Sequence, residues 1–421
     1  MNHAWMVLAA WALVSVAVAE PLTLEAALAT ATAPHPTWRI AESDLALAQA
    51  ERQRVDSERD IRVVLDGSLR SGQRPGGDWK PDNIARLVVR KPLFDFGRSE
   101  QARAASGQEV IAGQLALFGV ESLRRLDIMA RYFDVLLADR RYAVDNEFMA
   151  VAFVAQDQAR ERFEVGQLSR PRWLELQAQF QDARERLNAS LQALRSTRQK
   201  LAHALNRSDA VADDLVEPGL ADNDRALPDY AALLAWVHEH NPRVRVLRAR
   251  LAAVDARLAV AAAERYPTLD AEVVGAGYSR ESVTRDELSA GLVFSIPLYQ
   301  GGRVDALSAR ERAARAALLA EIDQTRFELA DTVLTTVQEI EWLRDSARVA
   351  ADTQIEYRDW ALERARAEYE LELKTNLGTN MVETQVAQLR RKQVEYRLAL
   401  AWARLEAMAG GTWPVITGAT P

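Results

Sequence analysis

The residue types that could do chemistry are sparse in this sequence and are not spaced for catalysis or metal binding. Histidine occurs five times and cysteine does not occur. The closest histidines are His238 and His240, in the segment VHEHNP, and side chains two positions apart do not share a helix face. No glycine-rich phosphate loop or nucleophile elbow is present. We therefore expect no catalytic centre, metal site or cofactor, and we expect both histidines at a solvated helix end.

Composition and the N-terminus bound the compartment. The formal net charge of -7 gives no indication of a nucleic-acid partner. The absence of cysteine excludes disulfides, thiolate metal sites and a lipidated N-terminal cysteine. Residues 1–19 carry no Asp, Glu, Lys or Arg and end in AVA before Glu20, which is typical of a cleaved signal peptide, although a buried N-terminal helix is an alternative. No later stretch reaches the ~20 apolar residues of a membrane helix, so any membrane crossing must use strands.

The sequence repeats itself at an offset of 205–206 positions. KPLFDFGR at 91–98 returns as IPLYQGGR at 296–303, and matching segments lie before and after this motif. Such self-similarity predicts a duplicated unit, and two copies suit a pseudo-symmetric part of a larger ring. The expected domains are a first repeat, a connector assigned to a belt around the helices, a second repeat and a C-terminal tail, at 20–206, 207–229, 230–410 and 411–421.

Each repeat contains two long helical segments. Residues 98–163 lack proline, and residues 303–373 lack both proline and glycine. Helices of this length would be rods of roughly 100 Å, longer than a compact domain can hold. Returning helices are expected over 172–206 and 379–409, with the connecting tips at 164–171 and 370–379. A free-standing coiled coil is the alternative that these helices alone would allow.

Four short segments alternate between apolar and polar residues and predict strands. They are residues 61–69, 84–93, 268–278 and 288–298. Their length and period-two pattern are typical of membrane-barrel strands, although half-buried strands of soluble proteins look similar. Aromatic residues near the strand ends favour the membrane interpretation, namely Trp79, Phe94, Tyr278 and Tyr299. If the apolar faces meet lipid, the charged side chains of these strands line the barrel lumen; they are Asp66, Arg86, Arg90, Asp270 and Glu272.

Four strands cannot close a barrel, and an open sheet edge is not tolerated in lipid, so several copies of the chain must pool their strands. The repeated motif then forms the junction between strand and helix, which we call the swivel. Pro92 and Pro297 lack an N–H and are expected where a strand stops. Gly97 in the first repeat and Gly302, with Gly301 before it, in the second permit the turn. The helices are expected to begin at Arg98 and Arg303.

With the swivels, the LTLEAALATATAPHP opening, the RFEVGQLSR tip and the paired hairpins, the chain resembles the TolC-like outer membrane efflux proteins over essentially all of 22–410. The resemblance implies a mainly α fold with a small β part. It also implies a homotrimer whose twelve strands form one outer-membrane β-barrel, continued by a periplasmic α-helical barrel. Family members dock through a periplasmic adaptor (membrane fusion protein) onto an inner-membrane pump, and they pass small toxic compounds, metal ions or secreted proteins.

The resemblance also assigns roles to the helical tips. The first tip matches the family turn that meets the adaptor, over Val165, Gly166, Gln167, Leu168, Ser169 and Arg170. In the second tip Glu372 replaces that glycine. Tyr369 and Lys374 match the tyrosine and basic residue that close the family's periplasmic aperture, with ordinary helix surface as the alternative. Gly378 and Met381 occupy the family's acidic positions, so no acidic constriction ring of the usual kind is expected.

We therefore expect an outer-membrane channel that serves as the passive exit duct of a tripartite efflux or type I secretion system. A periplasmic coiled-coil adaptor or structural protein is the alternative from another class. An enzyme is disfavoured because the site chemistry is missing. Which compound or protein is exported, and by which pump, is not encoded in any motif of the sequence.

Overall fold

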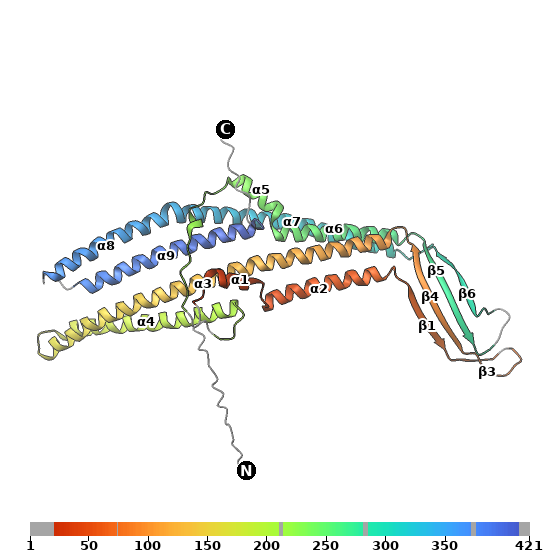
Figure 1. Ribbon diagram of the computed structural model, residues 1–421, viewed down its shortest axis with the longest axis horizontal. Helices are drawn as coiled ribbons and strands as arrows, with labels where there is room; N and C mark the ends of the chain where they lie inside the picture. Colours follow the sequence, from red (N-terminus) through yellow and green to blue (C-terminus); the bar gives the residue numbers. More distant parts are fainter. Residues whose placement is uncertain (1–20, 74, 210–213, 281–284, 372–375, 412–421) are drawn as a thin grey trace, which may run out of the picture. The chain divides into compact units, whose positions relative to one another are not determined.

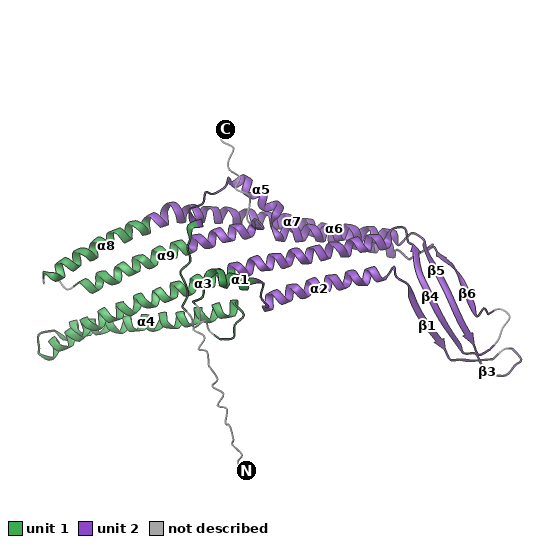
Figure 2. Cartoon of the chain, viewed as in Figure 1, with its two compact units in different colours: residues 1–31, 127–221, 350–396 green, residues 32–126, 222–349, 397–421 purple. Residues whose placement is uncertain are grey.

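The computed structural model describes residues 21–73, 75–209, 214–280, 285–371 and 376–411, so the expected signal peptide, the tail beyond residue 411, and Glu372 and Lys374 lie outside the described residues. The chain forms two compact units (Figure 2). Unit 1 comprises residues 1–31, 127–221 and 350–396, and unit 2 comprises residues 32–126, 222–349 and 397–421. Helices dominate the described residues, and a small sheet lies in unit 2, as the predicted fold class requires.

The sheet of unit 2 has four antiparallel strands in the order β1-β4-β5-β6 (Figure 1). They are β1 (Arg62–Ser68), β4 (Ile84–Phe94), β5 (Thr268–Tyr278) and β6 (Leu288–Ser295). Pairing of β4 with β5 joins the two hairpins, which lie about 200 positions apart in the sequence, into one sheet. A two-stranded ribbon, β2 (Ser71–Gly72) with β3 (Lys80–Pro81), extends the loop between β1 and β4.

The expected strand ends at the two prolines are only partly right. β4 does not stop at Pro92 but continues to Phe94, because the register shifts between Pro92 and Phe94. A bulge accommodates a residue that cannot donate to the ladder, so the proline is tolerated inside the strand. β6 ends at Ser295, before Pro297, and is therefore shorter than the segment 288–298 suggests.

Besides the sheet, unit 2 contains several helical segments. They include α2 (Pro36–Ser57), the first part of α3 (Arg98–Glu164), α5 (Tyr230–His240), α6 (Pro242–Ala263) and α7 (Arg303–Trp342). α2 and α6 each have proline in the first turn, where no N–H is needed. The Asn241 side chain accepts hydrogen bonds from two backbone N–H groups of α6. Small residues bring the helices close, as in the buried cluster of Ala112, Val246 and Ala249.

In unit 1 the second part of α3 packs with α4 (Arg170–Ala204), with nearly all of α8 (Arg348–Glu370) and with the first part of α9 (Leu377–Met408). A chain of contacts gives the order α8, α9, α3, α4 (Figure 2). The Thr384 hydroxyl on α9 donates to the Arg358 carbonyl on α8. Val382 and Leu389 of α9 are buried with Val144 of α3. Aromatic pairs such as Phe153–Phe180 then join α3 to α4.

The second long helix is not continuous over 303–373. α7 ends at Trp342, a π-helical turn follows at Leu343–Ala347, and α8 ends at Glu370. Leu343 and Ala347 are both buried, and the wider turn turns both side chains inward. Period-3.6 analysis cannot detect this change, because the amino acids around it remain good helix formers.

The N-terminal segment of unit 1 contacts the connector. α1 (Leu24–Ala29) is capped by the Thr23 side chain, and Leu22 forms a parallel bridge with Leu215 of the connector. A short turn, η2 (Ala221–Asp224), closes the connector. None of the helices described is long and apolar enough to cross a membrane.

Candidate functional site

The strand register places six charged side chains on one face of the sheet. Directly paired residues share a face, and the pairs Asp66–Arg86 and Arg90–Glu272 lie directly opposite each other. Arg90 and Glu272 form an ion pair. The same parity adds the remaining members of this charged face, so that the full set is Arg62, Asp66, Arg86, Arg90, Asp270 and Glu272. The sequence analysis named five of the six and missed Arg62. Arg62 lies four positions before Asp66, so the same alternation places it on the same face.

The opposite face of the sheet is apolar, apart from Lys91 near the first swivel, and is uncovered in the single chain. Leu65 is 73% exposed, Leu292 67% and Phe294 61%. Few soluble proteins leave a contiguous apolar surface of this kind open to water. β1 and β6 are the edge strands of the described sheet, so their outer backbone groups have no strand partner within it. The sheet therefore has two unsatisfied features, an apolar face and two open edges.

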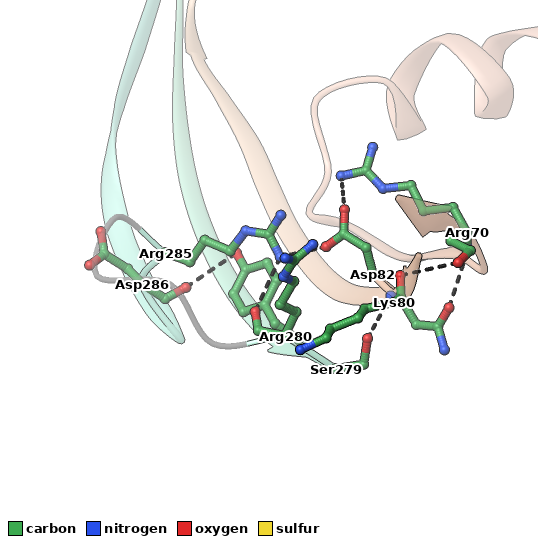
Figure 3. A network of polar contacts seen from close by, with 10 residues as sticks. Arg70, Lys80, Asp82, Ser279, Arg280, Arg285 and Asp286 are labelled. Carbon is green, nitrogen blue, oxygen red and sulfur yellow. Dashed lines mark hydrogen bonds and ion pairs between the residues drawn. The ribbon is translucent and has the colours of Figure 1, made fainter. Parts of the chain in front are cut away.

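A network of polar contacts joins the loops at one end of the sheet (Figure 3). Asp82 is 9% exposed and accepts from Arg70 at 2.6 Å and from Arg285 at 3.0 Å. These two arginines come from the β1–β4 loop and the β5–β6 loop, so Asp82 links both hairpins. Hydrogen bonding, first from Arg285 and then from Arg70, holds the pKa of Asp82 below its usual range. The Ser279 hydroxyl accepts from the Asn83 N–H at 2.7 Å and reinforces the link.

The first swivel is a tight reversal between β4 and α3. Phe96 and Gly97 both have left-handed backbone angles, with φ of 53° and 82°. The Asp95 carboxylate accepts from the Ser99 N–H at 2.9 Å and caps α3, which begins at Arg98. The Phe96 ring stacks on Tyr266 at 5.4 Å between centroids, and this contact compensates for the unusual backbone of a non-glycine residue.

The second swivel has the same path with different contacts. Gly301 and Gly302 have φ of 59° and 77°, and α7 begins at Arg303. The Gln300 side chain donates to the Glu264 carbonyl at 2.8 Å, and the Arg303 guanidinium lies 3.3 Å from the Glu264 carboxylate. Both contacts anchor the junction to the end of α6. Pro297 lies just after β6, upstream of this anchor.

The first tip is a compact, exposed helix end between α3 and α4. Gly166 has φ of 74°, and the Gln167 N–H donates to the Arg162 carbonyl at 2.8 Å, the geometry of a Schellman cap. Phe163 stacks on Trp173 at 5.2 Å and fixes the two helices beneath the turn. The predicted adaptor-contacting residues all lie on this turn and at the start of α4, where only Leu168 is half-buried.

The second tip is described only at its two ends. Tyr369 is 54% exposed at the end of α8. Gly378 packs against α3, where an added Cβ would lie 3.0 Å from the Val151 side chain, and Met381 is 42% exposed. Glu383, the first carboxylate beyond the family's acidic positions, is engaged in an ion pair with Arg358. The family's two acidic positions therefore carry no carboxylate, and the first carboxylate beyond them is paired.

The two neighbouring histidines make contacts within unit 2 that the prediction of a solvated helix end did not include. His238 lies 3.2 Å from the Arg326 carbonyl, and His240 stacks on Trp236 at 3.7 Å between centroids. Both side chains are half-buried, so the expected solvated helix end is wrong. The reason is that α5 packs against its neighbours in unit 2 through this end. Among the described residues, no group of three or more His, Asp or Glu side chains could hold a metal ion.

A partly exposed polar hub in unit 1 was missed by sequence reasoning. Glu217 of the connector accepts from Lys392 at 2.7 Å, from Arg140 and from the Tyr396 hydroxyl at 3.3 Å. Burial opposes ionisation of Glu217, but hydrogen bonds from Lys392 and Arg140 outweigh it and lower its pKa. The Tyr132 hydroxyl lies within 2.7 Å of two carbonyls, and burial raises the pKa of Tyr132 to about 12. The connector has no periodic pattern, so no sequence signal pointed to this hub.

Comparison with known proteins finds a family model that matches the second repeat. Residues 233–411 match the model of the outer membrane efflux protein family. The predicted resemblance to outer membrane efflux proteins is confirmed over this part of the chain. No match was found among curated protein sequences.

The fold of the chain is that of solved outer-membrane channels. A membrane protein from Pseudomonas aeruginosa is 18% identical, with a TM-score of 0.75 over 93% of this chain and 90% of that one. The outer membrane protein VceC from Vibrio cholerae is 17% identical, with a TM-score of 0.71 over 92% and 96%. The CmeC outer membrane channel from Campylobacter jejuni is 14% identical, with a TM-score of 0.74 over 92% and 85%. At these identities the likeness concerns the fold alone.

Proposed function

We propose that the chain is the passive exit duct of a tripartite efflux or type I secretion system. In this proposal a cleaved signal peptide directs the chain out of the cytoplasm to the outer membrane, where it forms a homotrimer. Each copy contributes β1, β4, β5 and β6 to a single twelve-stranded barrel. Energy for export comes from the partner pump, because a duct without a reaction centre has no means of coupling transport to chemistry.

The observation that carries the proposal is the sheet with an apolar face and two open edges. In lipid every backbone N–H and C=O must find a partner, so an open four-stranded sheet is not viable there. Pairing of β1 of one copy with β6 of the next satisfies both edges and closes the ring. The same closure turns the apolar face toward lipid and encloses the charged face, with Arg90, Glu272 and their neighbours, as an aqueous lumen.

The helices have a matching role in the proposal. They extend the lumen through the periplasm as a helical barrel, with the tip over Val165–Arg170 meeting the hairpins of a periplasmic adaptor. The exposed surface of this tip and its rigid cap at Gly166 support a docking role. At the second tip Tyr369, Glu372 and Lys374 remain the candidates for closing the periplasmic aperture.

The test is the oligomeric mass and conductance of the purified chain in detergent. We expect a protein mass of three chains by light scattering and large, long-lived conductance steps in planar bilayers. A folded chain that stays monomeric in detergent, or a trimer that never conducts, contradicts the proposal. Replacing Tyr369 and Lys374 together is expected to raise the conductance of the resting trimer, and unchanged conductance removes their aperture role.

The alternative function that the sequence allows, a periplasmic adaptor, is disfavoured. An adaptor has no use for an exposed apolar sheet face, and the family match is to outer membrane efflux proteins. Fractionation separates the two readings. The duct is expected with outer-membrane fragments, and release with soluble periplasmic proteins would favour the adaptor.

A further inference from the structure

The two outer helices of unit 1 carry complementary faces that no contact within the described chain uses. Because α8, α9, α3 and α4 follow one another in that order, α8 and α4 form the two borders of the layer (Figure 2). A layer with two unlike borders can continue from copy to copy in one direction. What lies on each border therefore decides whether copies can join there.

The border face of α8 is acidic and apolar. α8 turns Ala351, Arg358 and Ala365 toward α9, and the positions on the opposite side follow a three-four spacing. This face, which we call the acidic seam, consists of Glu356, Trp360, Glu363, Ala367 and Leu371. Trp360 is 70% exposed, one of the largest exposed aromatic surfaces in the described chain. Glu356 and Glu363 form no ion pair with any described residue.

The border face of α4 is basic. α4 turns Ala183, Ser190 and Leu194 toward the layer, where they are buried. The positions on its outer side again follow the three-four spacing, and this face, the basic seam, consists of Gln181, Arg184, Asn188, Leu191 and Arg195. Arg184 and Arg195 are exposed and form no ion pair with the residues that the structure describes. One carboxylate, Glu185, borders this seam.

Contacts across the layer set the levels of the two seams. Arg358 of α8 meets Glu383 of α9, and an added Cβ at Gly378 of α9 would touch Val151 of α3. Phe153 of α3 meets Phe180 of α4, with ring centroids 5.8 Å apart. Counting along the antiparallel helices at 1.5 Å per residue sets Glu363 level with Arg184 to within about two residues.

The same counting gives the relative levels of the other seam residues. Trp360 lies level with Asn188 to within about three residues, and Glu356 lies within about two helical turns of Arg195. If copies are related by rotation about an axis along the helices, equal levels meet. The Glu363 carboxylate of one copy then faces the Arg184 guanidinium of the next, beside the tryptophan.

We propose that the acidic seam of one copy binds the basic seam of the next, with Glu363 paired to Arg184 and Trp360 packed beside Asn188. The contact is head-to-tail between unlike faces, so it closes only as a ring. The inference rests on the proposed trimeric duct, to which it assigns the residues that seal its helical wall. The ion pairs set register and partner choice, and the exposed tryptophan supplies the apolar contact.

The experiment uses the absence of cysteine from the natural sequence. The full-length chain carrying Trp360→Cys and Asn188→Cys is purified in detergent and treated with a short bis-maleimide, which tolerates a small offset. We expect covalent dimers and closed trimers on a denaturing gel. Neither single variant alone forms them, because the seams are unlike. A control pair of Trp360→Cys with Asp182→Cys, which lines a groove on another side of α4, is expected to remain uncrosslinked.

The first cysteine pair removes Trp360, which is itself part of the proposed contact. A second pair, Glu363→Cys with Arg184→Cys, therefore tests the seam with the tryptophan in place. In the first cysteine pair, Glu363→Arg is expected to lower the crosslinked fraction about two- to fivefold, the range for an exposed ion pair, and Arg184→Glu to restore it. A conducting trimer that crosslinks through neither pair overturns the seam and leaves the duct standing. A monomer in detergent overturns the duct, and the seam with it.

Discussion

At the scale of single residues, backbone geometry at the swivels makes a direct prediction. Gly97 has φ of 82°, an angle that costs an L-residue about 1–2 kcal/mol, and an added Cβ would touch nothing. Gly97→Ala is therefore expected to destabilise the chain through backbone strain alone. The matched control is Gly107→Ala within α3, where the site is equally open and the helix gains about 0.5–1 kcal/mol. Thermal unfolding of both variants measures the difference, and two shifts of equal sign would contradict this reading of the swivel.

Glu217 of the connector gives a residue-scale prediction with a pH dependence. Its pKa in the folded chain lies below the usual 4.5, so its ion pairs with Lys392 and Arg140 stabilise the fold above that pH. The stabilisation is lost as the pH falls through the lowered pKa. Glu217→Gln is expected to cost about 1 kcal/mol at pH 7, discounted for partial exposure, and progressively less as the pH falls below 4.5.

Melting curves at pH 7, 5 and 3 measure the effect of Glu217→Gln. The control is Glu161→Gln on α3, an exposed carboxylate with no ion pair among the described residues, which is expected to track the natural chain at every pH. A Glu217→Gln effect that persists unchanged at pH 3 would assign the role of Glu217 to packing.

At the scale of elements, how well the sequence predicts depends on how local the cause is. The starts of α3 and α7 follow from glycines in the swivels, whose backbone freedom is a property of the residue itself. Features that depend on tertiary contacts could not be predicted from the sequence. The bulge at Pro92 depends on pairing with β5, and the π-helical turn at Leu343–Ala347 depends on which side chains are buried. The hub at Glu217 likewise needs three segments distant in sequence to converge.

The faces of β6 give the prediction that belongs to this scale. Leu292 lies on the apolar face of the sheet, and its neighbour Val293 lies on the charged face, opposite Asp270. If the apolar face meets lipid, Leu292→Arg costs ~2–4 kcal/mol per chain near the bilayer midplane. Val293→Arg instead places a cation beside a carboxylate in water. We expect trimer yield in outer-membrane fractions to fall for Leu292→Arg and to hold for Val293→Arg, and equal yields would mean that the two faces do not separate lipid from water.

At the scale of the whole molecule, the charged face of the sheet predicts how the duct treats ions. Each chain contributes three arginines and three carboxylates to this face, namely Arg62, Arg86, Arg90, Asp66, Asp270 and Glu272. A closed barrel of several copies keeps the same balance, however many copies it contains. A balanced wall creates no net potential to select one sign of ion, so its contribution to the reversal potential in a salt gradient is close to zero.

Removing one sign of charge should unmask the other. Asp270→Asn with Glu272→Gln leaves the arginines in excess and is expected to move the reversal potential toward anion selectivity. The matched variant, Arg62→Gln with Arg86→Gln, is expected to move it toward cations by a similar amount. Because the shifts are measured against the natural channel, any constant contribution from the helical wall cancels. Shifts of the same sign, or none, would place these side chains outside the conducting path, and the charged face would then not be the lumen.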